Sequence, residues 1–367
     1  MSPGQDWPVP LHAAQDALAT PRARTATARP RISVVVPTFR RETMLLRCLE
    51  SVLGQTFEAF ELLVTNDDPQ GDWPASVSAL AEADPRVRLL SSERRLGQAG
   101  NLNRAMRAAQ GEWIKPVFDD DVLEPRALEV LLAAAEASPG VVLVRGLASH
   151  HVDGRLRRVD RAMRGVRGPL PGREALAGMY RQDFEIGTPT QVLVRSDVVR
   201  SGAWMPEEPS LRIGVDWWWY ATLLQRGDLL LLDRLVAQEH QGHDTVTKRM
   251  GEDVLYVELD VLRRRLYEVL TRGASAVAGE ESARDGGGPL ADDKDQGASG
   301  ALTGECLKLP PLADVQGMNR LLRAACAWRA GRRMEALRRA AGVRNAGAWR
   351  LFARVAWRRV RSRRSCA

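Results

Sequence analysis

The sequence predicts an α/β protein built on a doubly wound mixed sheet with flanking helices, extended at its C-terminus by further helices. Strand-like and helix-like segments alternate through residues 32–144, as is typical of βαβ folds. Two of the strand-like segments end at clusters of aspartates. Ligands of such sheets bind at the carboxyl ends of the strands, so we expect a binding site there.

The first βαβ unit is predicted within residues 32–65. Residues 32–36 are mostly β-branched and fit a strand buried on both faces, which Pro37 ends. Apolar side chains then recur at helical spacing through residues 42–55, and residues 60–65 form a second apolar strand. The crossover that joins two such parallel strands is right-handed in nearly all proteins.

The alternation continues toward the C-terminus. We expect strands over 87–90, 113–118, 141–144, 191–194 and 229–237, and helices over 100–110, 128–137 and 254–271, with another helix opened by the aromatic block 216–220. Between the third and fourth of these strands, an Arg- and Gly-rich stretch over 146–173 interrupts the pattern. We expect it to be irregular.

Composition excludes several classes of protein. With 367 residues and 44% hydrophobic composition, the chain can bury a full core, which excludes collagenous and wholly disordered chains. No run of eighteen apolar residues and no secretory signal is seen, so we expect a cytoplasmic protein. The cysteines are scattered, which predicts plain thiols rather than disulfides or a zinc site; they are Cys48, Cys306, Cys326 and Cys366.

The formal charge of +7 is unevenly distributed. Residues 320–367 hold 15 arginines and one acidic residue, a net charge of +14. Residues 1–319 hold 38 basic and 45 acidic residues, a net charge of −7. This asymmetry indicates an acidic body joined to a basic tail that contacts an anionic partner.

The acidic triplet Asp119, Asp120 and Asp121 directly follows a predicted buried strand. Adjacent carboxylates repel one another, so a cation such as Mg²⁺ or Mn²⁺ is their natural partner. A solvated acidic loop is the alternative, and the position after a strand favours the metal. Asp67 and Asp68 occupy the equivalent position after the second strand, where they would either bind a base or ribose or form a turn.

Two further groups are candidates for the site. His240 and His243 follow the last strand, and one metal ligand is favoured over two because Gly242 between them indicates a loop. Asp216 stands at the expected start of a helix, where an N-cap is the alternative role. Trp217 and Trp218 follow Asp216 in an aromatic block whose side chains span too much of the helix circumference for all of them to face one core. Flat aromatic faces suit sugar rings, so we expect these two residues to contact the acceptor.

The order of several motifs resembles that of family 2 glycosyltransferases of the GT-A fold. These motifs are the strand 32–38, Gln55-Thr56-Phe57 before Phe60-Glu61-Leu62, Asn66-Asp67-Asp68, Gly97 through Asn103 to Gly111-Glu112-Trp113-Ile114, and Asp119-Asp120-Asp121 followed by Pro125. The resemblance implies inverting transfer of a sugar from a nucleotide-diphosphate sugar to a hydroxyl of a glycan or lipid-linked acceptor. It also implies Mn²⁺ or Mg²⁺ as cofactor.

The resemblance further implies roles at the nucleotide. Pro37 and Thr38 match the strand end that lines the base. Asp67 matches the carboxylate that reads the base, and Asn103 matches an asparagine near the nucleotide.

The same resemblance implies roles at the metal and the reacting atoms. Asp120 matches the metal-binding carboxylate of the D-x-D signature, with Asp119 and Asp121 beside it near the ribose and sugar. Asp216 matches the catalytic base, and His240 matches the histidine that completes the metal or pyrophosphate site, with His243 as its competitor.

Three positions depart from the family pattern: Phe118 and Val215 replace acids, and Leu102 replaces an arginine. They leave open an alternative function, a catalytically idle module of a polysaccharide assembly that binds a nucleotide sugar or glycan.

The predicted domains follow from these assignments. We expect a disordered leader over 1–30, a GT-A glycosyltransferase domain over 31–250, a helix over 251–272, a flexible linker over 273–304 and a basic helical tail over 305–367.

Residues 343–364 of the tail form an amphipathic pattern. Arg350, Arg354, Arg358 and Arg361 share one face, opposite Trp349, Phe352, Ala353, Ala356 and Val360. Such a helix fits the interface of an anionic membrane, which would place the protein peripherally at the inner face. Docking on the acidic body is an alternative of nearly equal weight, and nucleic-acid binding is a weaker third.

Overall fold

The computed structural model describes residues 29–161, 168–241, 252–282, 309–329 and 333–363. The chain divides into two compact units. The first comprises Met1–Pro169, Ile186–Glu207 and Leu230–His243, and the second comprises Leu170–Glu185, Glu208–Leu229 and Asp244–Ala367. The predicted domain 31–250 thus contains segments of both units.

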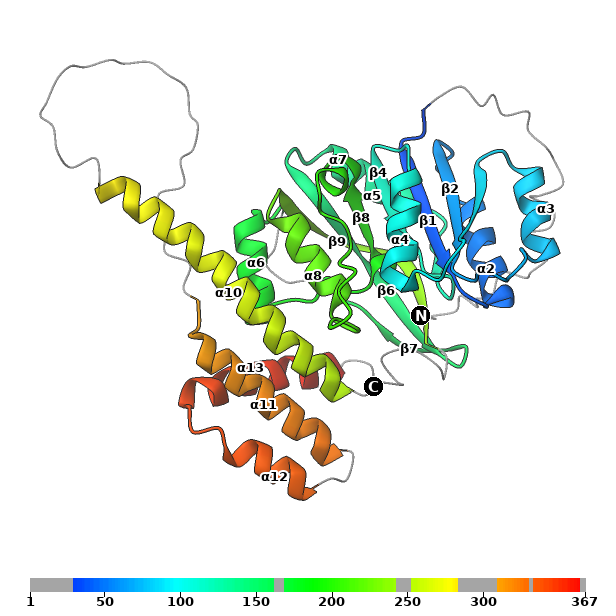
Figure 1. The fold of residues 1–367 in the computed structure, drawn as a ribbon. Helices are drawn as coiled ribbons and strands as arrows, with labels where there is room; N and C mark the ends of the chain where they lie inside the picture. The colour runs from blue at the N-terminus through cyan, green and yellow to red at the C-terminus, as the bar shows by residue number, and fades with distance from the viewer. Residues whose placement is uncertain (1–28, 162–167, 242–251, 283–308, 330–332, 364–367) are drawn as a thin grey trace, which may run out of the picture. The chain divides into compact units, whose positions relative to one another are not determined.

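The first unit is built around a mixed sheet (Figure 1). Its strands are β1 (Ile32–Thr38), β2 (Phe60–Asn66), β3 (Val87–Ser91), β4 (Trp113–Pro116), β5 (Val122–Leu123), β6 (Val141–Val152), β7 (Arg155–Val159), β8 (Val192–Arg195) and most of β9 (Asp228–Gln241). The order is β3-β2-β1-β4-β8-β6-β9-β5, with β7 paired to β6. Strands β1 to β4 are parallel, and β8 joins β4 antiparallel.

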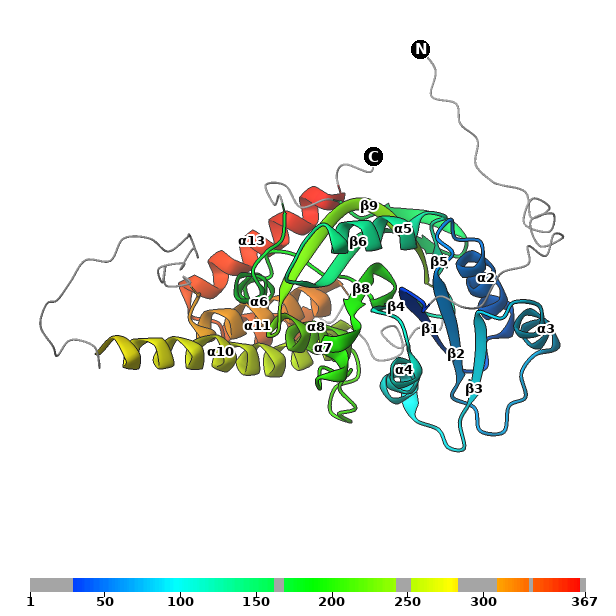
Figure 2. The same ribbon diagram turned by 90° about the horizontal axis from the view of Figure 1, so that it is seen from above.

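Helices cover both faces of this sheet. They are α2 (Glu42–Leu53), α3 (Ala75–Ala83), α4 (Gly97–Ala108), α5 (Ala127–Glu136), the 3₁₀ turn η1 (Pro189–Gln191) and α7 (Ser196–Arg200). Figure 2 shows α2 and α5 on one side of the parallel strands and α4 on the other. β1 and β2 are buried along their whole length, which explains why most of their residues are apolar.

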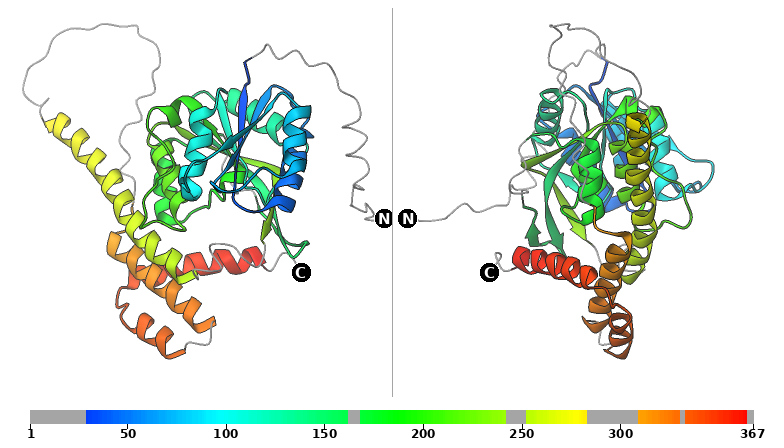
Figure 3. Two further views of the ribbon diagram at one scale, coloured as in Figure 1. Left: turned by 45° about the vertical axis from the view of Figure 1, so that its right-hand side comes forward. Right: turned by 90° about the vertical axis from the view of Figure 1, so that its left-hand side faces the viewer.

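The second unit is mostly helical. It contains α6 (Gly172–Arg181), α8 (Val215–Leu224), α10 (Glu252–Ser282), α11 (Leu312–Arg329), α12 (Arg333–Ala341) and α13 (Ala346–Arg363). Within this unit α11 packs against α10, α12 and α13 (Figure 3). The predicted fold class, an α/β mixed sheet with flanking helices and a C-terminal helical extension, is confirmed.

Two segments differ from the sequence predictions. The irregular stretch expected from residue 146 instead continues β6 to Val152 and returns as β7. An Asp153-Gly154 turn joins the two strands, and both residues have positive φ (53° and 73°), as a tight hairpin requires. Helix α10 runs to Ser282, ten residues into the predicted linker, because alanines favour helix there. The predicted leader lies outside the described residues, apart from Arg29 and Pro30.

Candidate functional site

All the predicted nucleotide-site residues except Asn103, which is on α4, lie at or shortly after the ends of β1, β2 and β4. These strands are parallel neighbours, so their carboxyl ends meet at one edge of the sheet. The backbone N–H of Asp67 donates to the carbonyl of Thr38 (3.0 Å), and the Thr38 hydroxyl donates to Asp119 Oδ2 (2.6 Å). Hydrogen bonds therefore connect the ends of all three strands.

Asp119 and Asp120 share one cationic partner, Arg41. The Arg41 guanidinium donates to Asp120 Oδ2 at 2.6 Å and to Asp119 Oδ1 at 3.4 Å. Burial raises the pKa of Asp119 to about 6, although the Thr38 hydroxyl and Arg41 oppose this shift. Arg41 was not among the predicted site residues, and its position just after β1 is the signal in the sequence that could have indicated it.

Asp121 faces away from this pair. The residue is 5% exposed, and its carboxylate accepts hydrogen bonds from the Thr190 hydroxyl at 2.5 Å and from the backbone N–H of His240 at 3.1 Å. Burial and the nearby Glu239 carboxylate raise its pKa well above the usual range. Asp119 and Asp120 thus hydrogen-bond to Arg41, whereas Asp121 connects the segment after β4 to η1 and β9. The predicted role of Asp121 beside the ribose or sugar stays a prediction.

The carboxylates of Asp119 and Asp120 fit a divalent cation. Mg²⁺ and Mn²⁺ prefer oxygen ligands and bind through one or two carboxylates plus water and substrate phosphates. In the structure the Arg41 guanidinium supplies the positive charge next to these two carboxylates. Among the described residues, no cluster of three or more His, Cys, Asp or Glu side chains has the arrangement of a metal site. Asp119 and Asp120 could supply carboxylate ligands to such a cation, and the predicted ligand role of His240 stays a prediction.

His240 lies within β9 and has a mixed environment. Its Nδ1 is buried and makes no hydrogen bond, its Nε2 is 2.9 Å from Arg47, and its ring stacks on His151 with centroids 4.9 Å apart. Burial, together with the positive charge of Arg47, lowers its pKa to about 4. The imidazole is therefore neutral, as a metal ligand must be. The competing His243 lies outside the described residues.

The side chain of Asp67 is engaged by the start of α4. Its two carboxylate oxygens accept the backbone N–H groups of Leu96 (2.6 Å) and Gly97 (2.9 Å). A carboxylate at this position satisfies amides that the helix leaves unpaired. Its predicted role in reading the base stays a prediction. The neighbouring Asp68 accepts a hydrogen bond from Arg40 at 2.6 Å.

Asn103 and Asn101 lie in different environments on α4. The Asn103 amide bonds to the backbone of Met205 (2.8 and 3.0 Å) and to Glu207 (2.7 Å), so it anchors that loop. Asn101, two residues earlier, donates to the carbonyl of Thr65 at 3.0 Å, and its own carbonyl oxygen is buried without a partner. Asn101 is the asparagine that meets the strand ends. The predicted role of Asn103 near the nucleotide stays untested.

A cavity of about 290 Å³ opens beside these residues at the ends of β1 and β2. Thr38, Arg41, Asn66, Asp68 and Trp73 are among its lining residues. It offers cationic, carboxylate and aromatic groups in one place, which suits a nucleotide diphosphate.

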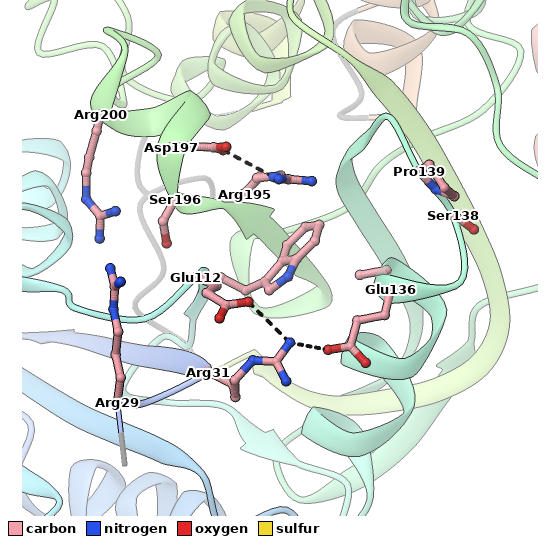
Figure 4. Close-up of a pocket in the computed structure, with 12 residues that line it drawn as sticks. Arg29, Arg31, Glu112, Glu136, Ser138, Pro139, Arg195, Ser196, Asp197 and Arg200 are labelled. Carbon is pink, nitrogen blue, oxygen red and sulfur yellow. Dashed lines mark hydrogen bonds and ion pairs between the residues drawn. The ribbon is translucent and has the colours of Figure 1, made fainter. Parts of the chain in front are cut away.

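A larger cavity of about 390 Å³ lies at the opposite, amino end of β1 and β4 (Figure 4). Two of the arginines that line it form ion pairs: Arg31 with Glu112 (3.2 Å) and Glu136, and Arg195 with Asp197 (3.3 Å). We assign the site to the smaller cavity because Asp68 lines it and because two other lining residues, Thr38 and Arg41, hydrogen-bond to Asp119 and Asp120.

Asp216, Trp217 and Trp218 belong to the second unit. Gly214 is the N-cap of α8, so Asp216 lies in the first helical turn, where its Oδ1 accepts the backbone N–H of Trp217 at 3.1 Å. Trp217 and Trp218 are half-buried, whereas Trp219 is fully buried. Asp216 as the base and the two tryptophans as acceptor contacts stay predictions.

Comparison with known proteins identifies the family. Residues 33–202 match the family described as "Glycosyl transferase family 2". An uncharacterized protein of Mycobacterium tuberculosis is 31% identical over 231 residues, covering 61% of this chain and 72% of that protein. The succinoglycan biosynthesis protein ExoO of Rhizobium meliloti is 29% identical over 201 residues, covering 54% of this chain and 57% of that protein.

The name of a third relative states its acceptor and linkage. The GalNAc(5)-diNAcBac-PP-undecaprenol beta-1,3-glucosyltransferase of Campylobacter jejuni is 34% identical over 107 residues, covering 29% of this chain and 35% of that protein. The chain thus spans between about a third and three quarters of the lengths of these three relatives. Their similarity and the family match agree with the order of motifs in the sequence. The chain belongs to the family 2 glycosyltransferases.

Proposed function

We propose that this protein transfers a sugar from a nucleotide-diphosphate sugar to a hydroxyl of a glycan or lipid-linked acceptor, with inversion and with the help of Mn²⁺ or Mg²⁺. The observation that carries the proposal is the meeting of Thr38, Asp119 and Asp120 beside the cavity at the strand ends. The donor's nucleotide would occupy that cavity, and Asp119 and Asp120 would hold the cation that its diphosphate requires.

The reaction is a single displacement. Asp216 accepts the proton of the acceptor hydroxyl as its oxygen bonds to the anomeric carbon. The bond from that carbon to the diphosphate oxygen breaks at the same time, and the electron pair leaves with the nucleotide diphosphate. Asp119 and Asp120 would hold the cation, which would supply positive charge to stabilise this leaving group. No covalent intermediate forms, so the configuration inverts.

The names of two relatives support the choice of acceptor. One relative is a succinoglycan biosynthesis protein, and another is named for an undecaprenol-linked acceptor. We therefore place this protein in the assembly of a surface polysaccharide or a lipid-linked oligosaccharide.

A screen of nucleotide sugars tests the function. Thermal-shift measurements with Mn²⁺ should identify one donor that raises Tm, and incubation with that donor should release the free nucleotide diphosphate. Binding of a nucleotide sugar without any release or transfer would favour the alternative function, a catalytically idle binding module. The alternative is motivated by Phe118 and Val215, which stand where the family pattern has acids. Absence of binding by any nucleotide sugar would contradict both.

We propose that a lipid surface is a further partner, through the second unit. None of the helices that the structure describes is both long and apolar enough to span a membrane. In α13, Ala348 and Phe352 pack with Leu321 and Val343, and Arg354 bonds to Asp183 at 2.6 Å. The predicted amphipathic face is therefore partly used within the protein.

Helix α12 offers a better membrane-facing surface. Met334 and Leu337 are 66% and 53% exposed on one side of this helix, beside the exposed Arg338. The 15 arginines of residues 320–367 supply the charge that attracts anionic lipid.

Replacing Met334 and Leu337 together by serine should reduce flotation with anionic liposomes several-fold, because the lipid-facing apolar area is lost. Serine substitution of Val257 and Val261, which are 43% and 46% exposed on α10, removes apolar area elsewhere in the unit and should leave flotation unchanged. Equal flotation of the α12 variant and the unmodified protein would refute the assignment.

A further inference from the structure

One short turn of the first unit contacts three buried carboxylates. In Thr188–Gln191, the Thr188 hydroxyl donates to Glu239 (2.6 Å) and the Thr190 hydroxyl donates to Asp121 (2.5 Å). The Gln191 amide donates to Asp160 Oδ2 at 2.6 Å. These acids come from β9, from the segment after β4 and from the segment after β7, so one turn links three parts of the sheet.

Thr190 has a particular place in this turn. Its side chain is fully buried, and its Oγ1 accepts the backbone N–H of Phe118 at 3.0 Å while donating to Asp121. A hydroxyl is the smallest group that donates and accepts at once. The Thr190 hydroxyl therefore hydrogen-bonds to both ends of the segment 118–121, and Asp119 and Asp120 lie between these two bonded residues.

Other contacts hold the turn itself in place. Lys115, which is fully buried in β4, donates through Nζ to the Thr190 carbonyl. The Gln191 side chain folds back to accept the Thr188 backbone N–H at 3.1 Å. Gly187 makes room for it, since a Cβ at that position would lie 1.7 Å from Gln191 Oε1, and its φ of 87° suits glycine. The turn is therefore preorganised around the acids.

We infer that Thr190 is a positioning residue for the proposed glycosyl transfer: its hydroxyl holds the 118–121 segment so that Asp119 and Asp120 present their carboxylates to the same cation. The inference rests on the proposed function. Thr190 acts through Asp121 and the Phe118 amide. Residues that support metal ligands in this way typically change metal affinity by about 10- to 100-fold when they are substituted.

Three variants of the full chain test the inference. Thr190→Val keeps the shape of the side chain and removes the hydroxyl, whereas Thr190→Ser keeps the hydroxyl. Ser33→Ala is the control, because the Ser33 hydroxyl is equally buried and bonds to Glu61 (2.6 Å) and to the Gly111 amide (2.8 Å) at the other end of β1. Its loss lowers stability at a distance from the acids.

The primary measurement is the dissociation constant of Mn²⁺ alone, from electron paramagnetic resonance. Thr190→Val should raise it by about tenfold or more. Thr190→Ser should stay within about twofold of the unmodified protein, since the bridging hydroxyl remains. Ser33→Ala should lower Tm without changing the dissociation constant. With an active donor, Thr190→Val should lower kcat more than it changes the KM for the acceptor.

Hydrogen exchange supplies a measurement that needs neither metal nor transfer. The amides of Phe118 and His240 should exchange faster in Thr190→Val and at the unmodified rate in Thr190→Ser. Unchanged exchange and unchanged Mn²⁺ affinity in Thr190→Val would overturn the inference, as would equal weakening of Mn²⁺ binding by Ser33→Ala. A protein that binds Mn²⁺ in this Thr190-dependent way but transfers no sugar would refute only the proposed function. If the unmodified protein binds no Mn²⁺, the positioning of Asp119 and Asp120 for a cation is refuted whatever the exchange rates.

Discussion

Replacing Asp216 by asparagine should reduce sugar transfer by about 10²- to 10⁴-fold, the usual contribution of a general base. Asparagine preserves the size of the side chain and the hydrogen bond to the Trp217 amide but cannot accept the acceptor's proton. Donor binding should survive, because the nucleotide and the cation are assigned to residues of the first unit. The measurement is kcat with the identified donor, alongside the donor affinity from calorimetry.

Glu174→Gln is the matched control for this experiment. Glu174 is an exposed acid in the first turn of α6, in the same unit as Asp216, so its neutralisation also removes a negative charge that favours a helix start. Turnover should stay near the unmodified rate in this variant. If Asp216→Asn turns over as fast as the control, Asp216 is not the base.

The sheet and its acidic edge are predictable from sequence because their signals are local. The β-branched run at 32–36 and the apolar run at 60–65 are both confirmed as wholly buried strands, and each ends within a residue or two of the expected position. The strand before Asp119 is shorter than predicted, since β4 ends at Pro116 instead of residue 118, and Asp119 lies three residues beyond its end. The β6–β7 hairpin also has a local signal, the Asp153-Gly154 pair, although an irregular stretch was predicted there.

The partners of the site residues could not be predicted, because they come from distant parts of the chain. Arg41 meets Asp120 across 79 positions, and Thr190 meets Asp121 across 69. Nothing in the local pattern of either residue specifies that pairing. The contacts of α4 could not be predicted for the same reason. Asn101 and Asn103 are two residues apart on this helix, yet Asn101 contacts the strand ends and Asn103 contacts Met205. Topology decides such contacts, whereas periodicity only says which residues are buried.

Asp120→Asn should weaken Mn²⁺-dependent binding of the nucleotide sugar by at least about tenfold, because one of two carboxylate ligands is lost. Stability should change little. The Arg41–Asp120 ion pair is partly exposed (35% and 19% for the two side chains), and such pairs contribute about 0–1 kcal/mol. Calorimetry with and without Mn²⁺ measures the effect, and thermal unfolding measures the stability.

Glu129→Gln separates loss of a ligand from loss of a charge. Glu129 is an acid of α5 in the same unit, paired with Arg126 at 2.8 Å, and its substitution also removes one negative charge. A long-range effect of net charge on an anionic donor would strengthen binding modestly and equally in both variants. A ligand role predicts opposite outcomes: Asp120→Asn loses the Mn²⁺ dependence, while Glu129→Gln retains it. Equal donor affinity with and without Mn²⁺ in the unmodified protein would remove the cation from the mechanism and leave Arg41 as the positive charge facing the diphosphate.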